Sequence, residues 1–315
     1  MRTIAATSLI VLALCARSSL SVAAPRTAPV LVALAPPPGD DARRAVPIGP
    51  AGQVFEPDGK GAWIRRTQFA TADTISVAGR AGTTTVALGE GIVYRLAPNG
   101  WSALRIMQRG KAVMSAGPRA VAAVGRQLFA LDRTQAGEPV RLGIAPDNVL
   151  ALGAGKTTVI QTARGLFRID GARVVPIKKA PRHANKLVGD RWALVDHGVV
   201  DLRTGKTTTW PAGLAVMACT LGADDRLVAV ASVRGGLELV TLHQNKVERA
   251  PIEIVPVPTV ALGTAVGVAV DKAGRAVVAL RDGRLAVRER GAWSLTNVVD
   301  ELPVARPGPA PALSH

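Results

Sequence analysis

Short runs of aliphatic residues alternate with polar turns along almost the whole chain. The runs from Ile92 to Leu96 and from Leu227 to Ala231 are typical, and Gly, Asp and Asn separate each run from the next. Apolar residues spaced three and four apart, the mark of an amphipathic helix, are nearly absent after the first two dozen positions. The pattern therefore predicts an all-β protein built from many short strands.

A pair of short strands joined by a polar turn recurs seven times. The aligned copies place these residues at equivalent positions: Phe55, Tyr94, Phe129, Phe167, Val200, Glu238 and Ala286. Successive anchors lie 33 to 48 residues apart. Such internal repetition indicates an array of similar structural units.

The turn that closes each pair of strands has its own signature. It reads Pro57-Asp58-Gly59 in the first copy and Asp170-Gly171 in the fourth, and Asx-Gly pairs supply the positive φ of tight hairpins. Trp63, Trp101 and Trp293 each follow such a turn. We expect these tryptophans to pack as aromatic staples on the outer strand of each unit.

Two further apolar runs precede most of the pairs, as at Thr74 to Gly79 and Thr84 to Leu88. Four strands in about 40 residues are typical of one β-propeller blade. The sequence thus predicts a seven-bladed β-propeller of four-stranded antiparallel blades over residues 46–302. The first unit lacks clear inner strands, and Val30 to Leu34 with Ala45 to Ile48 are the candidates to supply them.

Over residues 46 to 300 the chain resembles the β-propeller superfamily. Gly165-Leu166-Phe167-Arg168-Ile169-Asp170 is similar to the degenerate blades of bacterial sensor-type propellers, and the stretch from Gly198 to Lys206 is similar to a quinoprotein-like strand and turn. The chain has no Trp-Asp blade ending, kelch Gly-Gly pair or sialidase-type box. The resemblance implies the fold and leaves the function open.

Residues 1–24 have the organisation of a bacterial signal peptide. Arg2 precedes an apolar run from Ile4 to Leu14, and the small residues Val22-Ala23-Ala24 offer a cleavage site. We expect export to the periplasm or outside the cell, with no transmembrane segment. Cys15 resembles a lipoprotein acylation site, but Leu14 stands where that site requires a small residue. Pro-rich segments are expected at 25–45 and 303–315.

Composition narrows the function classes. The 315 residues include 39 Lys and Arg against 23 Asp and Glu, a formal net charge of +16, and only 3% are aromatic. So few aromatic residues disfavour sugar-stacking clefts and platforms for single-stranded nucleic acid. The positive charge favours acidic partners, although a GC-rich coding bias would also enrich Arg. Nucleic acid fits poorly with export.

No motif assigns a catalytic centre, a metal or a cofactor. The four histidines, His183, His197, His243 and His315, lie far apart without ligand spacing. The stretch Gly153 to Thr158 imitates a phosphate-binding loop, but Leu150 occupies the place of its first glycine, so we interpret the stretch as a blade turn. Cys219, in an apolar run, is expected to be a buried structural thiol.

Propeller topology sorts the charged residues between two faces. The connections between blades and the turns between second and third strands emerge on one side, here called the connection face; the other turns emerge on the opposite side, the hairpin face. We predict a basic connection face, against the alternative of cations scattered over all loops. The candidate binding residues are Arg109, Lys111, Arg126, Arg164, Lys178, Lys179, Arg182, Arg234 and Arg281.

The sequence thus favours an exported, monomeric, non-catalytic propeller that recognises a protein, an acidic polymer or an anionic surface. One alternative is a propeller enzyme, a hydrolase, lyase or quinoprotein-like oxidoreductase with its site at the central channel. Clustered His, Asp, Glu or Tyr side chains at the channel mouth would favour that alternative, and an aliphatic lining would count against it. A second alternative is an envelope assembly factor.

Overall fold

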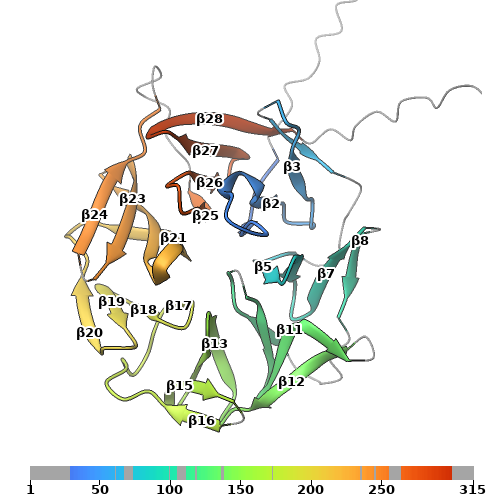
Figure 1. Cartoon of the computed structure of the whole chain (residues 1–315), viewed down its shortest axis with the longest axis vertical. Coiled ribbons are helices and arrows are strands. Elements are labelled where there is room, and N and C mark those ends of the chain that lie inside the picture. Colours follow the sequence, from blue (N-terminus) through green and yellow to red (C-terminus); the bar gives the residue numbers. More distant parts are fainter. Residues whose placement is uncertain are drawn as a thin grey trace, which may run out of the picture.

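The chain folds into a ring of small antiparallel β-sheets around a central channel (Figure 1). The computed structural model describes residues 29–299, apart from 61, 67–73, 99, 105–110, 118, 136–137, 172, 235, 245 and 255–263. The expected signal peptide, Cys15 and the tail at 303–315 lie outside these residues. Regular structure is all β, with two single-turn 3-10 helices, η1 (Ala42–Arg44) and η2 (Ala223–Asp225). The predicted propeller fold is confirmed.

Six blades are complete four-stranded sheets, with the strands of each in chain order from the channel outward. The first three are β5 (Val77–Ala81), β6 (Thr84–Leu88), β7 (Val93–Ala97) and β8 (Gly100–Ala103); β9 (Ala112–Met114), β10 (Val121–Val124), β11 (Gln127–Gln135) and β12 (Glu138–Ile144); and β13 (Val149–Ala154), β14 (Thr158–Thr162), β15 (Gly165–Asp170) and β16 (Arg173–Pro176).

The next three blades follow the same order around the ring (Figure 1). They are β17 (Lys186–Val188), β18 (Trp192–Val195), β19 (Gly198–Asp201) and β20 (Lys206–Thr209); β21 (Ala215–Leu221), β22 (Leu227–Val233), β23 (Gly236–His243) and β24 (Lys246–Pro251); and β25 (Ala265–Val270), β26 (Ala276–Leu280), β27 (Arg284–Glu289) and β28 (Ala292–Val299).

The first predicted unit does not form a seventh complete sheet. Its strands β1 (Ala33–Ala35) and β2 (Val46–Ile48) make a two-stranded sheet, whereas β3 (Phe55–Pro57) and β4 (Trp63–Arg65) extend the last blade, because β4 pairs in parallel with β28. A single bridge, Ile48 to Val54, links the two halves. The prediction of seven complete blades therefore exceeds the observed number by one. The divided unit still fills the place between β25 and β5.

The repeat positions chosen from sequence are structurally equivalent. All seven anchors, from Phe55 in β3 to Ala286 in β27, lie on the third strand of their unit. The predicted inner strands of the first unit are also confirmed, since β1 falls at residues 33–35 and β2 at 46–48. Local sequence therefore encodes each unit separately.

The hairpin turns and tryptophans follow the predicted pattern. Gly59 and Gly171 adopt positive φ of 78° and 57° at the turns between third and fourth strands. Trp63 and Trp293, on the outer strands β4 and β28, are buried. Trp101, on β8, donates its indole N–H to the carbonyl of Gly52, 2.7 Å away in the preceding unit. The tryptophans join neighbouring units at the rim.

The core consists of aliphatic layers between blades. Val230, Leu239 and Val278, for example, belong to one buried cluster that spans the blades β21–β24 and β25–β28. Equivalent Val, Leu and Ala clusters fill the other junctions. Each sheet thus buries both faces against its neighbours, which explains the high apolar content without helices.

The ring closes where the first unit packs on the last blade. Near the channel, a Cβ atom added to Gly267 in β25 would overlap the Cβ of Leu34 in β1, so the two strands approach closely. The Leu31 N–H donates to the carbonyl of Arg281 at 3.0 Å. At the rim, Val298 and Val299 of β28 pair with Trp63 and Ile64 of β4. Contacts at both inner and outer edges therefore hold the chain ends together.

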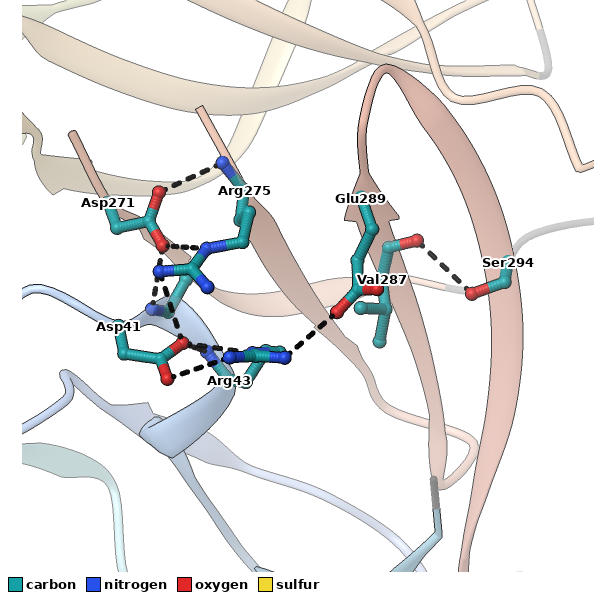
Figure 2. A network of polar contacts seen from close by, with 8 residues as sticks. Asp41, Arg43, Asp271, Arg275, Val287, Glu289 and Ser294 are labelled. Carbon is teal, nitrogen blue, oxygen red and sulfur yellow. Dashed lines mark hydrogen bonds and ion pairs between the residues drawn. The ribbon is translucent and has the colours of Figure 1, made fainter. Parts of the chain in front are cut away.

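A polar network fastens the same junction on the hairpin face (Figure 2). Asp271, whose side chain is buried, accepts from Arg275 Nε at 2.6 Å and from the N–H of Ala42 at 3.3 Å. Asp41 accepts two bonds from the Arg43 guanidinium, at 3.1 and 3.2 Å, and one from the Arg43 backbone N–H at 3.1 Å. It also lies 3.6 Å from Arg275. The network joins η1 of the first unit to the β25–β26 turn.

Replacing Gly267 by alanine tests the close approach at the closure. The added methyl group would overlap Leu34, so we expect the free energy of unfolding to fall by roughly 1–3 kcal/mol. Gly143→Ala is the matched control, because a Cβ at Gly143 in β12 would meet no heavy atom within 4 Å. Urea unfolding of both variants measures the effect, and equal stabilities would contradict this account of the closure.

Acid should weaken the Asp41 part of the network. The Arg43 side chain, through its hydrogen bonds, holds the pKa of the Asp41 carboxyl below its ordinary value of 3.8, although burial acts in the opposite direction. The stabilisation is therefore present above pH 3.8 and disappears as the pH falls through the lower folded-state pKa.

We accordingly expect Asp41→Asn to be less stable than the wild type at neutral pH, with a difference that shrinks below pH 3.8. Urea unfolding across a pH series measures this difference. Asp170→Asn, at the last residue of β15, controls for loss of a carboxylate outside the network. A difference that grows on acidification would argue against the pairing.

Candidate binding face and central channel

Eight of the nine candidate cations lie within the described residues, on segments of the connection face. Arg126, Arg164, Arg234 and Arg281 occupy turns between second and third strands, and Lys111 directly precedes β9. Lys178, Lys179 and Arg182 share the connection from β16 to β17. Arg109 lies outside the described residues.

The side chains of all eight cations are exposed. Arg164 forms a long ion pair with Asp147, at 3.7 Å, and Arg126 donates to the carbonyl of Ala145 at 2.9 Å. For the other six, no carboxylate of the described chain lies within ion-pair distance. Most of these cations therefore keep their charge directed to solvent.

Carboxylates on the same face are fewer, and some already have partners. They are Glu90, Asp147, Asp196, Glu253 and Asp282. Asp196 accepts from the Asn185 amide at 2.8 Å, and Asp282 pairs with Arg284 at 2.5 Å. Glu253 lies between β24 and β25, just before the stretch 255–263 that is not described.

The candidate cations surround the ring and do not form one compact cluster. They come from four different blades and from two connections between blades. Lys179 departs furthest from the prediction, because its Cβ lies against Gly205, at the β19–β20 turn of the next blade. The aliphatic part of the Lys179 side chain therefore packs on that turn. For Lys178 and Arg182, no such contact with a glycine of the described chain is found.

Several charges on the hairpin face are paired, some of them between blades. Arg203 bridges from the β19–β20 turn to Asp225 at 2.8 Å, and Arg191 pairs with Asp201 at 3.0 Å. Arg119 donates to the carbonyls of Gly155 and Lys156 in the following blade, at 3.3 and 3.2 Å. Exposed cations with no carboxylate of the described chain in ion-pair distance also occur on this face, among them Lys60, Arg173 and Lys206.

The stretch that imitates a phosphate loop is a blade turn, as predicted. Residues 155–157 connect β13 to β14. Asp190 of the next blade accepts from the Thr157 N–H at 2.9 Å and from its hydroxyl at 2.8 Å. A Cβ at Gly153 would overlap the carbonyl of Gly189. The loop therefore serves contact between blades.

The central channel encloses a cavity of about 270 Å³ lined by the first strand of every unit. Its side chains are mostly aliphatic or small, such as Val77, Val113 and Val266. Lys186 is the one charged side chain of the described lining, and Asn185 and Cys219 add polar atoms. No group of three or more His, Cys, Asp or Glu in the described chain could hold a metal ion.

Sequence reasoning missed one contact in the channel, between Lys186 and Cys219. Burial raises the pKa of the Cys219 thiol, and the neighbouring Lys186, which hydrogen-bonds to it, acts in the opposite direction. Lys186 begins β17 and Cys219 lies in β21 of the next blade. The two residues are 33 positions apart, so no local motif could indicate their pairing.

Comparison with known proteins supports the fold and assigns no family. No protein-family model and no curated protein matches the chain. The extracellular domain of a putative one-component system from B. thetaiotaomicron superposes with a TM-score of 0.53 at 12% identity, over 85% of this chain and 38% of that one. The chain therefore spans well under half of that protein.

A second similar structure is YCF48 from Cyanidioschyzon merolae. Its TM-score is 0.54 at 13% identity, and the match covers 86% of this chain and 96% of that one. At such identities the likeness shows the fold alone. Within the residues described, no helix is long and apolar enough to cross a bilayer.

The Cys219 pair gives a testable titration. Because burial outweighs Lys186, the thiol should titrate above its ordinary pKa of 9.0 and react slowly with a small alkylating reagent at pH 8. Lys186→Met removes the opposing charge and should raise the pKa further. Alkylation rates against pH, followed by mass spectrometry, measure both values. A faster reaction in Lys186→Met would contradict the assignment.

Proposed function

We propose that the protein is an exported propeller that binds an acidic partner through its connection face. The partner is a protein, an anionic polymer or an anionic surface. The observation that carries the proposal is the set of exposed cations on this face whose charges no described carboxylate neutralises. Such a surface attracts polyanions over a Debye length of about 8 Å at physiological salt.

The scaffold suits this role. A closed ring holds loops from every blade in fixed relative positions, so a partner meets a preformed surface and little ordering entropy is lost on binding. The similar extracellular domain from B. thetaiotaomicron is consistent with a place outside the cytoplasm. The segment at residues 1–24, which has the sequence pattern of a signal peptide, also supports export.

The described channel lining supports binding over catalysis. A channel enzyme would need an acid and a base, or a nucleophile and a base, at hydrogen-bond distance from one substrate. The described lining holds no carboxylate and no histidine. Its groups of this kind are Lys186, Cys219, Ser76 and Thr220, and burial disfavours the reactive thiolate of Cys219.

Charge reversal on one face at a time tests the proposal. The triple variant Arg182→Glu, Arg234→Glu and Arg281→Glu should weaken binding to an immobilised heparin-type polyanion by roughly tenfold or more near 0.1 M salt, since three exposed charge contacts are lost. The elution salt of the intact protein measures the effect.

A matched triple on the hairpin face is Lys60→Glu, Arg173→Glu and Lys206→Glu, all at exposed positions. It changes the net charge by the same amount, and we expect its elution salt to stay close to that of the wild type. Equal losses in the two triples would show attraction by net charge alone and would refute a basic face. Capture from the envelope fraction at low and high salt, with both triples, then isolates the partner.

A further inference from the structure

A cleft of about 410 Å³ opens on the hairpin face, away from the proposed binding face. It lies between the divided first unit and the blade β5–β8. Its walls come from η1, β3 and the turns between β5 and β6 and between β7 and β8. A volume of this order is typical of small-molecule sites.

The cleft holds a buried arginine without an acidic partner. Arg80, at 5% exposure, donates from Nε to the carbonyl of Pro36 at 2.6 Å and from Nη1 to the carbonyl of Thr83 at 3.0 Å. Both acceptors are neutral. No carboxylate of the described chain lies within ion-pair distance of Arg80. Buried charges in proteins are ordinarily paired, so this guanidinium lacks a counter-charge.

Neighbouring side chains increase the positive charge. Arg44 and Arg66 line the same cleft. The one carboxylate of the lining, Glu56, lies 2.7 Å from Arg66 and is therefore already engaged. With three guanidinium groups and one carboxylate, the lining of the cleft carries a net charge of two positive units. Burial and, after it, the nearby Arg44 lower the pKa of Arg80, whereas Glu56 acts in the opposite direction.

Hydroxyl groups complete the donor set. Thr85 pairs with Arg80 across β5 and β6, so the two side chains share one face of the sheet. Thr84 and Thr85 both line the cleft, and Thr85 is buried. Guanidinium and hydroxyl groups that line a cavity of twofold positive charge match a dianionic phosphate group better than a single carboxylate.

We propose that this cleft binds the phosphate group of a small phosphorylated ligand. Arg80 is the fixed donor at the base of the site, because two carbonyls and burial hold its guanidinium in place. Arg44, exposed at the mouth, supplies the second charge. The volume of the cleft exceeds that of a bare phosphate ion, which leaves room for the rest of the ligand.

Thermal unfolding of the full mature chain tests the site with inorganic phosphate and with glycerol phosphate, each against sodium chloride at equal ionic strength. Phosphate at about ten times its Kd should raise the Tm of the wild type by about 3 °C beyond chloride. Arg44→Ala should at least halve this shift, and Arg80→Gln should abolish it. Arg173→Ala, an exposed arginine elsewhere on the hairpin face, should keep the full shift.

Arg44→Ala keeps the test decisive if Arg80→Gln does not fold. No phosphate shift beyond chloride, or an equal shift in Arg44→Ala and Arg173→Ala, would overturn the proposal. A larger shift with citrate than with either phosphate would also overturn it in favour of a carboxylate site. The polyanion experiment on the connection face uses other residues, so either proposal can fail while the other stands.

Discussion

The close packing of the first unit on the last blade is the contact on which the ring depends. Each blade buries its two faces only because a neighbour stands on either side, so an open ring would expose two aliphatic sheet faces and unpaired strand edges. Gly267 and Leu34 meet at the channel, Asp271 and Arg275 fasten η1 on the hairpin face, and β4 pairs with β28 at the rim. The residues joined in this way are more than 200 positions apart, so closure is established only when the whole chain has folded.

Ion pairs hold neighbouring blades together on one face of the ring, and exposed cations carry the proposed binding role on the other. On the hairpin face, side chains such as Arg203 and Asp225 pair across blade junctions and contribute to holding the ring. On the connection face, Arg182, Arg234 and Arg281 are exposed and have no acidic partner among the described residues. Paired charges produce little external field, whereas unpaired ones attract acidic partners.

The irregular first unit borders the positively charged cleft. In this unit β2 and β3 are linked by one bridge and β4 pairs with the last blade, and the cleft lies between the unit and the blade β5–β8. Arg80 lies in that cleft with carbonyl partners only. The first unit thus closes the ring at the rim through β4 and borders the positively charged cleft through η1 and β3.

The sequence by itself determined the repeat, because short aliphatic runs and Asx-Gly turns are local signals that each unit carries independently. The third-strand anchors, the hairpin turns, the outer tryptophans and even the inner strands near Ala33 and Val46 could all be predicted. Only the tertiary structure decided that six sheets are complete, that Gly267 and Gly153 serve close approach between blades, and that Lys186 meets Cys219. These features depend on the distance between neighbouring blades, which long-range packing sets and no short stretch of sequence encodes.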